Sequence, residues 1–287
     1  MGTDGYAEVN GVRLHYVSEG EGDLILFLHG FPEFWYAWKD QLAALGTDHR
    51  AVAVDMRGYN LSEKPAAVEA YRIPLLVDDV RALIAHLGYR TCTLVAHDWG
   101  GVVAWAFAIR HPEMLDRLVI INAPYPAIFG RELRENPAQQ RASAYMVTFR
   151  SPQAESILSA NNYAALTDGI LDSSAFTDED RAAYIAAWSQ PGALTGGLNY
   201  YRATAIGRPT AESAGTSVGS DDVPPLTVPT LVIWGERDPF LLTGNLDGLD
   251  GVVADLTVVR IPEGTHWVVH EMPERINKEI RNFLISH

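Results

Sequence analysis

The chain has 287 residues, of which 47% are hydrophobic and 20% are charged, the composition of a soluble globular protein with a sizeable core. Its formal net charge of −14, from 22 basic and 36 acidic residues, disfavours nucleic acid and anionic membranes as partners. The apolar runs are too short for a membrane span, and no signal-peptide pattern opens the chain, so we expect a cytoplasmic protein. The single cysteine, Cys92, excludes an internal disulfide and a cysteine-rich metal site.

Short apolar runs alternate with helical patterns along most of the chain. An Asn-Gly pair at Asn10 and Gly11 predicts a β-hairpin near the start. The alternation that follows predicts an α/β fold with a mostly parallel sheet flanked by helices. The predicted strands lie at 24–28, at 51–55, from Cys92, and at 118–122, 230–234 and 256–261, and the predicted helices at 35–45, 75–87, 102–110 and 276–284.

Strand patterns disappear between about Pro124 and Thr227, where helical patterns take over. One helix has a capping-box-like start at Thr177-Asp-Glu-Asp180. Residues 208–229 are rich in Gly, Ser, Thr and Pro, which predicts a loop. We therefore interpret 124–227 as a helical cap with its return loop, inserted after the sixth strand into a core made of 1–123 and 228–287.

The strand that begins at Cys92 ends in a tight turn at Asp98, between the small residues Ala96 and Gly100. Such a strand–turn–helix segment is typical of a nucleophile elbow, which pushes the middle side chain into the open. A carboxylate that attacks a saturated carbon forms an ester, and water can later attack the carbonyl of that ester. Asp98 therefore predicts substrates with an electrophilic sp³ carbon, such as an epoxide or a carbon–halogen bond. The alternative is that Asp98 only caps the following helix.

Further polar segments follow three other predicted strands. His29-Gly-Phe-Pro32 follows the strand at 24–28, and we expect the Phe31 and Trp99 N–H groups to form an oxyanion hole, although a simple turn is the alternative. Asp238 and His266 follow the strands at 230–234 and 256–261. The order nucleophile, acid, histidine is the order expected of an α/β-hydrolase triad, and Glu236 could supply the acid in place of Asp238.

Metal and cofactor sites are not expected. His270 lies four residues after His266, a spacing that can hold zinc on a helix, but the chain has no His-Glu-x-x-His sequence. The Gly20-Glu-Gly22 segment precedes a predicted strand, whereas a dinucleotide-binding loop follows one. We therefore expect a protein that works without a cofactor or a metal ion.

Taken together, these residues make the chain similar to the epoxide hydrolases of the α/β-hydrolase fold, in the branch that also includes haloalkane dehalogenases. The resemblance covers nearly the whole length. In that family the acid follows the strand that here ends at Trp234, which implies Asp238, whereas some dehalogenases place it where this chain has Asn122. The matching segments are His29-Gly-Phe-Pro-Glu-Phe-Trp-Tyr-Ala-Trp38, Asp55-Met-Arg-Gly-Tyr-Asn-Leu-Ser62, His97-Asp-Trp-Gly-Gly101, Trp234-Gly-Glu-Arg-Asp238 and His266.

The resemblance also implies two cap tyrosines that hold the epoxide oxygen. The Asn199-Tyr-Tyr201-Arg202 stretch implies Tyr201, although Tyr200 could take its place, and the spacing to a later proline implies Tyr145. Ring opening creates an alkoxide, and a phenol can donate a hydrogen bond and then a proton to it, whereas a departing halide needs no proton. Both tyrosines could instead be packing residues of the cap.

We also expect His29 and Trp35 to bind the substrate. The predicted activity is hydrolysis of an epoxide to a vicinal diol through a covalent ester on Asp98, with the small-molecule epoxide and water as the only partners. One alternative is a haloalkane or haloacid dehalogenase that uses the same nucleophile. Another is a catalytically silent, ligand-binding member of the same fold. The sequence does not indicate an oligomeric state.

Overall fold

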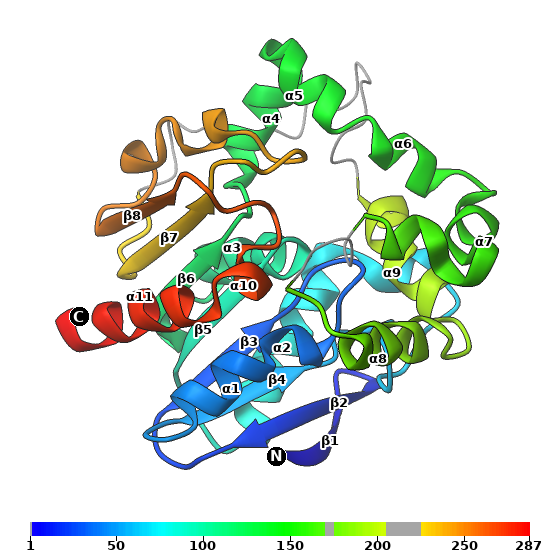
Figure 1. The fold of residues 1–287 in the computed structure, drawn as a ribbon. Helices are drawn as coiled ribbons and strands as arrows, with labels where there is room; N and C mark the ends of the chain where they lie inside the picture. The colour runs from blue at the N-terminus through cyan, green and yellow to red at the C-terminus, as the bar shows by residue number, and fades with distance from the viewer. Residues whose placement is uncertain (1, 170–174, 205–224) are drawn as a thin grey trace.

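The computed structural model describes residues 2–169, 175–204 and 225–287, and its centre is an eight-stranded sheet (Figure 1). The strands lie in the order β1-β2-β4-β3-β5-β6-β7-β8. The pairs β1–β2 and β2–β4 are antiparallel, and all other pairs are parallel. The strands are β1 Thr3–Val9, β2 Val12–Glu19, β3 Leu24–Leu28, β4 Arg50–Val54, β5 Cys92–His97, β6 Leu115–Ile121, β7 Thr230–Gly235 and β8 Leu256–Ile261.

Two layers of helices cover the sheet because its central strands are apolar on both faces. In β3, Leu26 packs into the cluster that contains α2 and α3, while the neighbouring Phe27 packs into the cluster that contains α1 and α11. This alternation is the period of two that a strand imposes on its side chains. The helices of these two layers are α1 Lys39–Leu45, α2 Ile73–His86, α3 Trp99–Arg110, α10 Val268–Glu271 and α11 Pro273–Ser286, and the short 3₁₀ helices are η1 Trp35–Trp38, η2 Val68–Tyr71, η3 Pro112–Met114, η5 Thr243–Leu246 and η6 Leu249–Gly251.

The predicted α/β fold is confirmed, with differences at the ends of elements. Val9 pairs with Val12 across a two-residue turn in which Asn10 and Gly11 both have positive φ, as an Asn-Gly hairpin requires. The helix predicted at 35–45 has these bounds in the structure, but its first turn is the 3₁₀ helix η1 and only the rest is the α-helix α1. The Trp35 N–H bonds the Asp55 carboxylate, and 3₁₀ turns are common where a helix begins.

Helices α4 to α9 lie between β6 and β7, and Figure 1 shows them gathered at the top and right of the sheet. The capping box predicted at Thr177 is confirmed, since its hydroxyl accepts from Asp180 N–H (3.1 Å) and its own N–H donates to the Asp180 carboxylate (2.8 Å). Most of the loop predicted at 208–229 lies outside the described residues. The helices are α4 Pro126–Glu135, α5 Pro137–Ala142, α6 Tyr145–Arg150, α7 Ala154–Thr167, α8 Asp178–Trp188 and α9 Ala193–Ala203.

One face of α8 is fixed to the core segment 32–39. Asp180, Tyr184 and Trp188 are spaced four residues apart, so they lie in one row along the helix. All three side chains are buried and each makes a hydrogen bond to that segment. The partners are Tyr36 and Lys39 for Asp180, Glu33 for Tyr184, and the carbonyl oxygen of Pro32 for Trp188.

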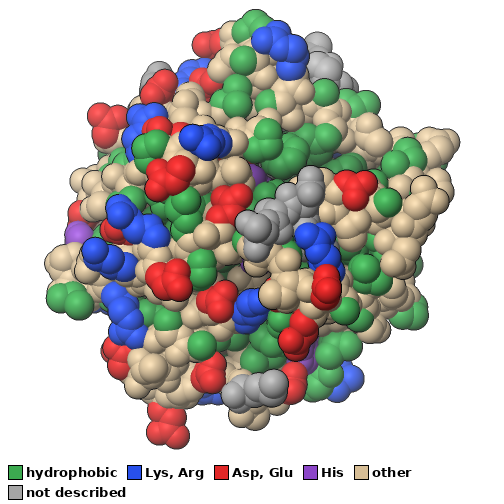
Figure 2. Space-filling model, in the orientation of Figure 1, with side chains coloured by type: hydrophobic (Ala, Val, Ile, Leu, Met, Phe, Trp, Pro, Cys, Tyr) green, Lys and Arg blue, Asp and Glu red, His purple; other side chains and the backbone are tan. Residues whose placement is uncertain are grey.

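The surface carries charges of both signs. Figure 2 shows acidic and basic side chains interspersed over the face that it presents. Within the described ranges, no helix combines the length and the apolar composition that crossing a bilayer would demand.

Candidate active site

Asp98 occupies the turn between β5 and α3 with φ 50° and ψ −120°. It stands at the N-cap position of α3, but its carboxylate makes no capping hydrogen bond, so the structure does not support the helix-cap alternative. The turn is tight because Gly100 packs against the end of β3. A Cβ there would lie 2.3 Å from the carbonyl oxygen of Leu28, so only glycine fits. The Asp98 side chain keeps 12% of its surface exposed.

The loop after β3 reaches the same carboxylate. Phe31 N–H donates to Asp98 Oδ1 at 2.8 Å. Gly30 allows this approach, since a Cβ at that position would lie 2.3 Å from Asp98 Oδ1. The Trp99 N–H belongs to the first turn of α3, where backbone N–H groups have no partner within the helix. The two backbone groups expected to form an oxyanion hole therefore flank Asp98.

His29 lies under this loop and is fully buried. Its Nε2 accepts from Met56 N–H (3.0 Å), so Nδ1 carries the proton and donates to Gly30 O (2.8 Å). Both ring nitrogens bond backbone groups, so the substrate contact predicted for His29 stays a prediction without support from the described contacts. The side chain shapes the loop that carries the Phe31 N–H.

Trp35 is also not brought to Asp98 by any contact among the described residues. Its ring packs edge-to-face against its sequence neighbours Phe34 and Tyr36, with centroids 6.2 and 5.5 Å apart. The substrate contact predicted for Trp35 therefore stays a prediction without support from the described contacts.

Asp238 and His266 meet at the ends of β7 and β8. His266 Nδ1 bonds Asp238 Oδ2 at 2.6 Å, and His266 Nε2 lies 3.7 Å from Asp98 Oδ2. Glu236, the alternative acid, instead forms an ion pair with Arg260. The structure thus brings together Asp98, Asp238 and His266, which are far apart in the sequence.

The charges of this cluster shift its pKa values. Burial tends to lower the pKa of His266, but the carboxylates of Asp238 and Asp98 outweigh burial and raise it to about 9. Burial tends to raise the pKa of Asp238, but His266 and two backbone N–H groups hold it below its ordinary value. Those two groups are the N–H groups of Phe240 and Leu241, which donate to Asp238 Oδ1 at 2.8 and 2.9 Å.

Tyr201 and Tyr145 lie beside this cluster. The Tyr201 ring stands edge-to-face on Trp99, with centroids 4.9 Å apart, and the Tyr145 ring lies 6.2 Å from that of Tyr201. Burial is the main cause that raises the pKa of each phenol, so both remain protonated donors at neutral pH. Tyr200, the alternative to Tyr201, donates its hydroxyl to Arg57 O at 2.8 Å and is used there.

Sequence reasoning missed a buried network around Glu33. One carboxylate oxygen accepts from His97 Nδ1 (2.9 Å), and the other contacts Tyr184 Oη (3.2 Å) and His270 Nε2. The other nitrogen of His97 contacts the carbonyl oxygen of His266 (2.9 Å). His270 therefore contributes to the packing of the protein interior through its contact with Glu33. Within the described residues, no group of three His, Cys, Asp or Glu side chains is arranged to hold a metal ion.

Asn122 was also missed as a site residue, although its position after β6 was noted. It is fully buried, and its amide contacts Asp238 Oδ2 (2.8 Å) as well as both backbone groups of Gly235. A polar side chain at the carboxyl end of a central parallel strand is the signal that could have found it.

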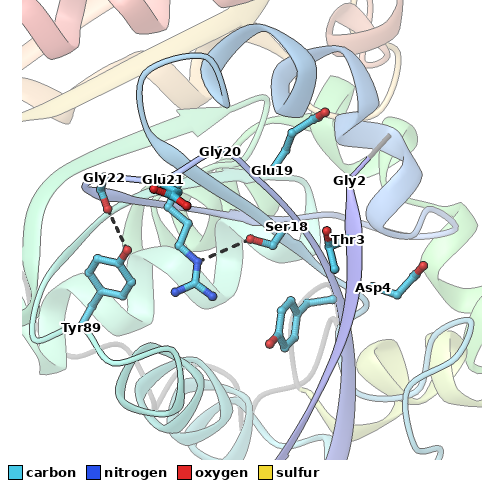
Figure 3. Close-up of a pocket in the computed structure, with 11 residues that line it drawn as sticks. Gly2, Thr3, Asp4, Ser18, Glu19, Gly20, Glu21, Gly22 and Tyr89 are labelled. Atoms are coloured by element: carbon cyan, nitrogen blue, oxygen red, sulfur yellow. Dashed lines mark hydrogen bonds between the residues drawn. The ribbon is translucent and has the colours of Figure 1, made fainter.

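A cavity lies away from the Asp98 cluster, at the β1–β2 edge of the sheet (Figure 3). Its volume is about 570 Å³, and none of the residues named above for the Asp98 cluster line it. Tyr89 and Arg50 in its wall are bonded to Gly22 O and Ser18 Oγ, as the dashed lines in Figure 3 show. The candidate active site is therefore the Asp98 cluster and not this cavity.

Comparison with known proteins identifies the family of the chain. Residues 23–273 match the family model described as alpha/beta hydrolase fold, which places the chain among the α/β-hydrolases. Epoxide hydrolase 4 of Mus musculus is 36% identical over 300 residues, which cover 99% of this chain and 80% of that protein. Epoxide hydrolase 1 of Caenorhabditis elegans is 39% identical over 291 residues, which cover 97% of this chain and 69% of that protein.

Solved structures of epoxide hydrolases are also similar to this chain. The crystal structure of Bacillus megaterium epoxide hydrolase in complex with an inhibitor has a TM-score of 0.93 and 41% identity, covering 98% of this chain and 99% of that chain. A mutant of that enzyme, complexed with its product (R)-3-[1]naphthyloxy-propane-1,2-diol, has a TM-score of 0.93 and 40% identity, covering 98% of this chain and 99% of that chain. The present chain belongs to the epoxide hydrolase family of the α/β-hydrolase fold.

Proposed function

We propose that this protein hydrolyses an epoxide to a vicinal diol through a covalent ester on Asp98, with water as the second reactant. The observation that carries the proposal is the environment of the Asp98 carboxylate. One oxygen faces the Phe31 N–H at 2.8 Å, and the other lies 3.7 Å from His266 Nε2. A carboxylate with an N–H donor on one side and a histidine on the other can serve as a nucleophile and then be regenerated.

In the first step, an Asp98 oxygen attacks one epoxide carbon and the bond from that carbon to the ring oxygen breaks. The electron pair of that bond stays on the ring oxygen, which becomes an alkoxide. Tyr145 and Tyr201 hold this oxygen, and one of them transfers its phenolic proton to it. The product of the step is a hydroxyalkyl ester on Asp98.

In the second step, His266 Nε2 takes a proton from a water molecule as the water oxygen attacks the carbonyl carbon of the ester. The N–H groups of Phe31 and Trp99 hold the oxyanion that forms. Collapse of the intermediate expels the diol oxygen, which takes the proton from His266. The second proton of the water leaves the Asp98 carboxyl group and restores the phenol that gave up its proton in the first step, and Asp98 keeps one oxygen from water. Asp238 holds His266 in the orientation that this step needs.

We further propose that residues 124–227 form a cap over a core of residues 1–123 and 228–287. Support comes from α6 and α9, which carry Tyr145 and Tyr201 and lie in this segment. Phe31, Phe149 and Phe240 pack around the two tyrosines with ring centroids about 5 to 6 Å apart, so the reacting group meets aromatic walls. The naphthyloxy product bound by the related enzyme makes aryl glycidyl ethers suitable test substrates.

Dehalogenation is the competing activity, because Trp99 fits a dehalogenase as well as it fits an epoxide hydrolase. The Tyr145–Tyr201 pair favours the epoxide, because an alkoxide needs a proton and a halide does not. The variant Tyr201→Phe separates the two activities. It should cripple epoxide opening, whereas a dehalogenase would still release halide at its original rate.

The decisive experiment traps the ester. In His266→Gln, mixing with an aryl glycidyl ether should raise the mass of the protein by the mass of one substrate, and the added mass should map to the peptide that contains Asp98. His86→Gln, on the exposed side of α2, is the matched control and should turn the substrate over without accumulating an adduct. If no adduct forms in His266→Gln with any reactive epoxide, the proposed function is wrong.

A further inference from the structure

We propose that Asn122 is a positioning residue that fixes Asp238, and through it His266, for hydrolysis of the ester. This inference rests on the proposed function and assigns a role to a residue outside the catalytic triad. Asn122 lies at the carboxyl end of β6. The adjacent strand in the sheet is β7, and Asp238 follows the carboxyl end of β7. It contacts neither Asp98 nor His266 in the hydrogen bonds of the described chain, so its influence on the reaction passes through Asp238.

The orientation of the Asn122 amide is determined by its surroundings. The side chain is fully buried, and its Oδ1 accepts from Gly235 N–H at 2.8 Å. Only the oxygen of an amide can accept this bond, so Nδ2 must face the opposite way. There it donates to Asp238 Oδ2 at 2.8 Å and to Gly235 O at 3.2 Å. A backbone group of β7 therefore sets the direction in which Asn122 meets the triad acid.

Asn122 completes the set of donors around the Asp238 carboxylate. Oδ2 faces both Asn122 Nδ2 and His266 Nδ1, and Oδ1 accepts the two N–H groups of Phe240 and Leu241. The backbone donors hold one oxygen from the loop after β7. Asn122 holds the other oxygen from a different strand, which prevents the carboxylate from rotating about its last side-chain bond. The oxygen that orients His266 is thus fixed in place.

The two chemical steps should depend on Asn122 to different extents. Ester formation needs the Asp98 carboxylate and the phenols, and it requires no proton transfer to His266. Ester hydrolysis needs His266 Nε2 to accept a proton from water, with Asp238 holding the opposite ring nitrogen. Loss of the Asn122–Asp238 hydrogen bond should therefore slow hydrolysis and leave ester formation nearly unchanged.

The main test is Asn122→Asp. Asn122 has φ 39°, a conformation that Asp tolerates almost as well as Asn, and Asp has the same shape. The variant keeps an acceptor for Gly235 N–H, but it replaces the donor to Asp238 with a second carboxylate. In single-turnover experiments with an aryl glycidyl ether, ester hydrolysis should slow by on the order of tenfold to hundredfold, as expected when a catalytic group loses its position. Ester formation should stay within about threefold of the original rate.

The pH profile gives a second readout that a purely structural role would not move. An added carboxylate near His266 favours the imidazolium form, so the pKa that governs ester hydrolysis should shift upward in Asn122→Asp. Asn122→Gly is the companion variant, because glycine accepts the positive φ and introduces no charge. Asn122→Gly should slow ester hydrolysis without raising the pKa that governs this step. It also keeps the test decisive if the aspartate variant does not fold.

Asn277→Asp is the matched control. Asn277 is a half-buried asparagine on α11, and its Nδ2 donates to Asp40 O (3.3 Å) on α1, not to the triad or the loop that holds Asp238. It should lower stability without changing the ratio of the two rate constants. The inference is overturned if hydrolysis is unchanged in both Asn122 variants, or if both steps slow together as stability falls. If the unaltered protein forms no ester at all, the proposed function is refuted instead.

Discussion

Asp98 Oδ2 and His266 Nε2 lie 3.7 Å apart, although the two residues come from strands β5 and β8, which are separated in the sheet by two others. The separation is long for a hydrogen bond and suits bridging by one water molecule. It is short enough for the charge on Asp98 to raise the pKa of His266. Asp98, the proposed nucleophile, and His266, the proposed base, are therefore coupled through charge before any substrate is bound.

This coupling predicts a change of the His266 pKa during turnover. In the free protein, burial lowers this pKa, but the carboxylates of Asp238 and Asp98 raise it to about 9. Esterification removes the charge of Asp98, so the pKa should fall in the intermediate. Since His266 must be neutral to act as a base, ester hydrolysis should accelerate with rising pH through an apparent pKa below that of the free protein. Single-turnover pH profiles and NMR titration of His266 provide the comparison, and an equal or higher pKa in the ester would contradict the prediction.

Removal of either candidate phenol should slow ring opening. In Tyr201→Phe or Tyr145→Phe, one donor to the developing alkoxide is lost, and ester formation should fall by about 10²-fold, as for loss of one oxyanion donor. Hydrolysis of the ester should be little affected. Tyr200→Phe is the control, because its hydroxyl bonds Arg57 O and its loss should cost about 1 kcal/mol of stability with no comparable loss of rate. Equal effects at positions 200 and 201 would argue against this assignment.

Gly30→Ala should displace Asp98, the proposed nucleophile. The added Cβ would lie 2.3 Å from Asp98 Oδ1, so either the loop or the carboxylate must move. We expect ester formation to fall by roughly 10²-fold, the effect of a misplacement of about 1 Å. Gly251→Ala offers a comparison at a site where a new Cβ meets nothing within 4 Å. Pre-steady-state rates with an aryl glycidyl ether would measure the difference, and similar rates in both variants would contradict the steric argument.

Glu33→Gln should destabilise the fold. Burial tends to raise the pKa of Glu33, but His270 and His97 hold it well below its ordinary value. A carboxyl group whose pKa is depressed by folding stabilises the native state above its unfolded pKa, and that contribution disappears as the pH falls through the folded value. At pH 7 the variant should lose roughly 3–5 kcal/mol of unfolding free energy, as when one partner of a buried ionic cluster is removed. The deficit should shrink in acid, which denaturant unfolding at several pH values would reveal.

The sheet could be predicted from the sequence, and so could the polar residues of the candidate site that follow its strands. Apolar runs mark parallel strands directly, and Asp98, Asp238 and His266 each follow one of them within a few residues. Since the carboxyl ends of parallel strands share one edge, residues after those strands had to meet. Turn chemistry was equally local, as Asn10-Gly11 and the Thr177 capping box illustrate.

Sequence reasoning failed where a role depends on distant partners. The sequence did not show that the His29 ring bonds the backbone of Met56, which follows the next strand. Glu33 meets His270, 237 positions later in the chain, and no periodicity announces such a pair. The 3₁₀ geometry of the first turn, η1, was not predicted, and there the Trp35 N–H bonds a carboxylate beyond β4. In each case a tertiary hydrogen bond overrode the local pattern.

The row of Asp180, Tyr184 and Trp188 separates the residues that should be kept in an engineered variant from those that can be changed. Because these side chains anchor α8 to the loop beside Asp98, altering them should also disturb the candidate active site. The exposed side of helix α6 offers a safer place for mutant libraries, since Val147 is 64% exposed and the helix also carries Tyr145, whose ring lies beside that of Tyr201. New selectivity is best sought there, with the α8 anchor left untouched.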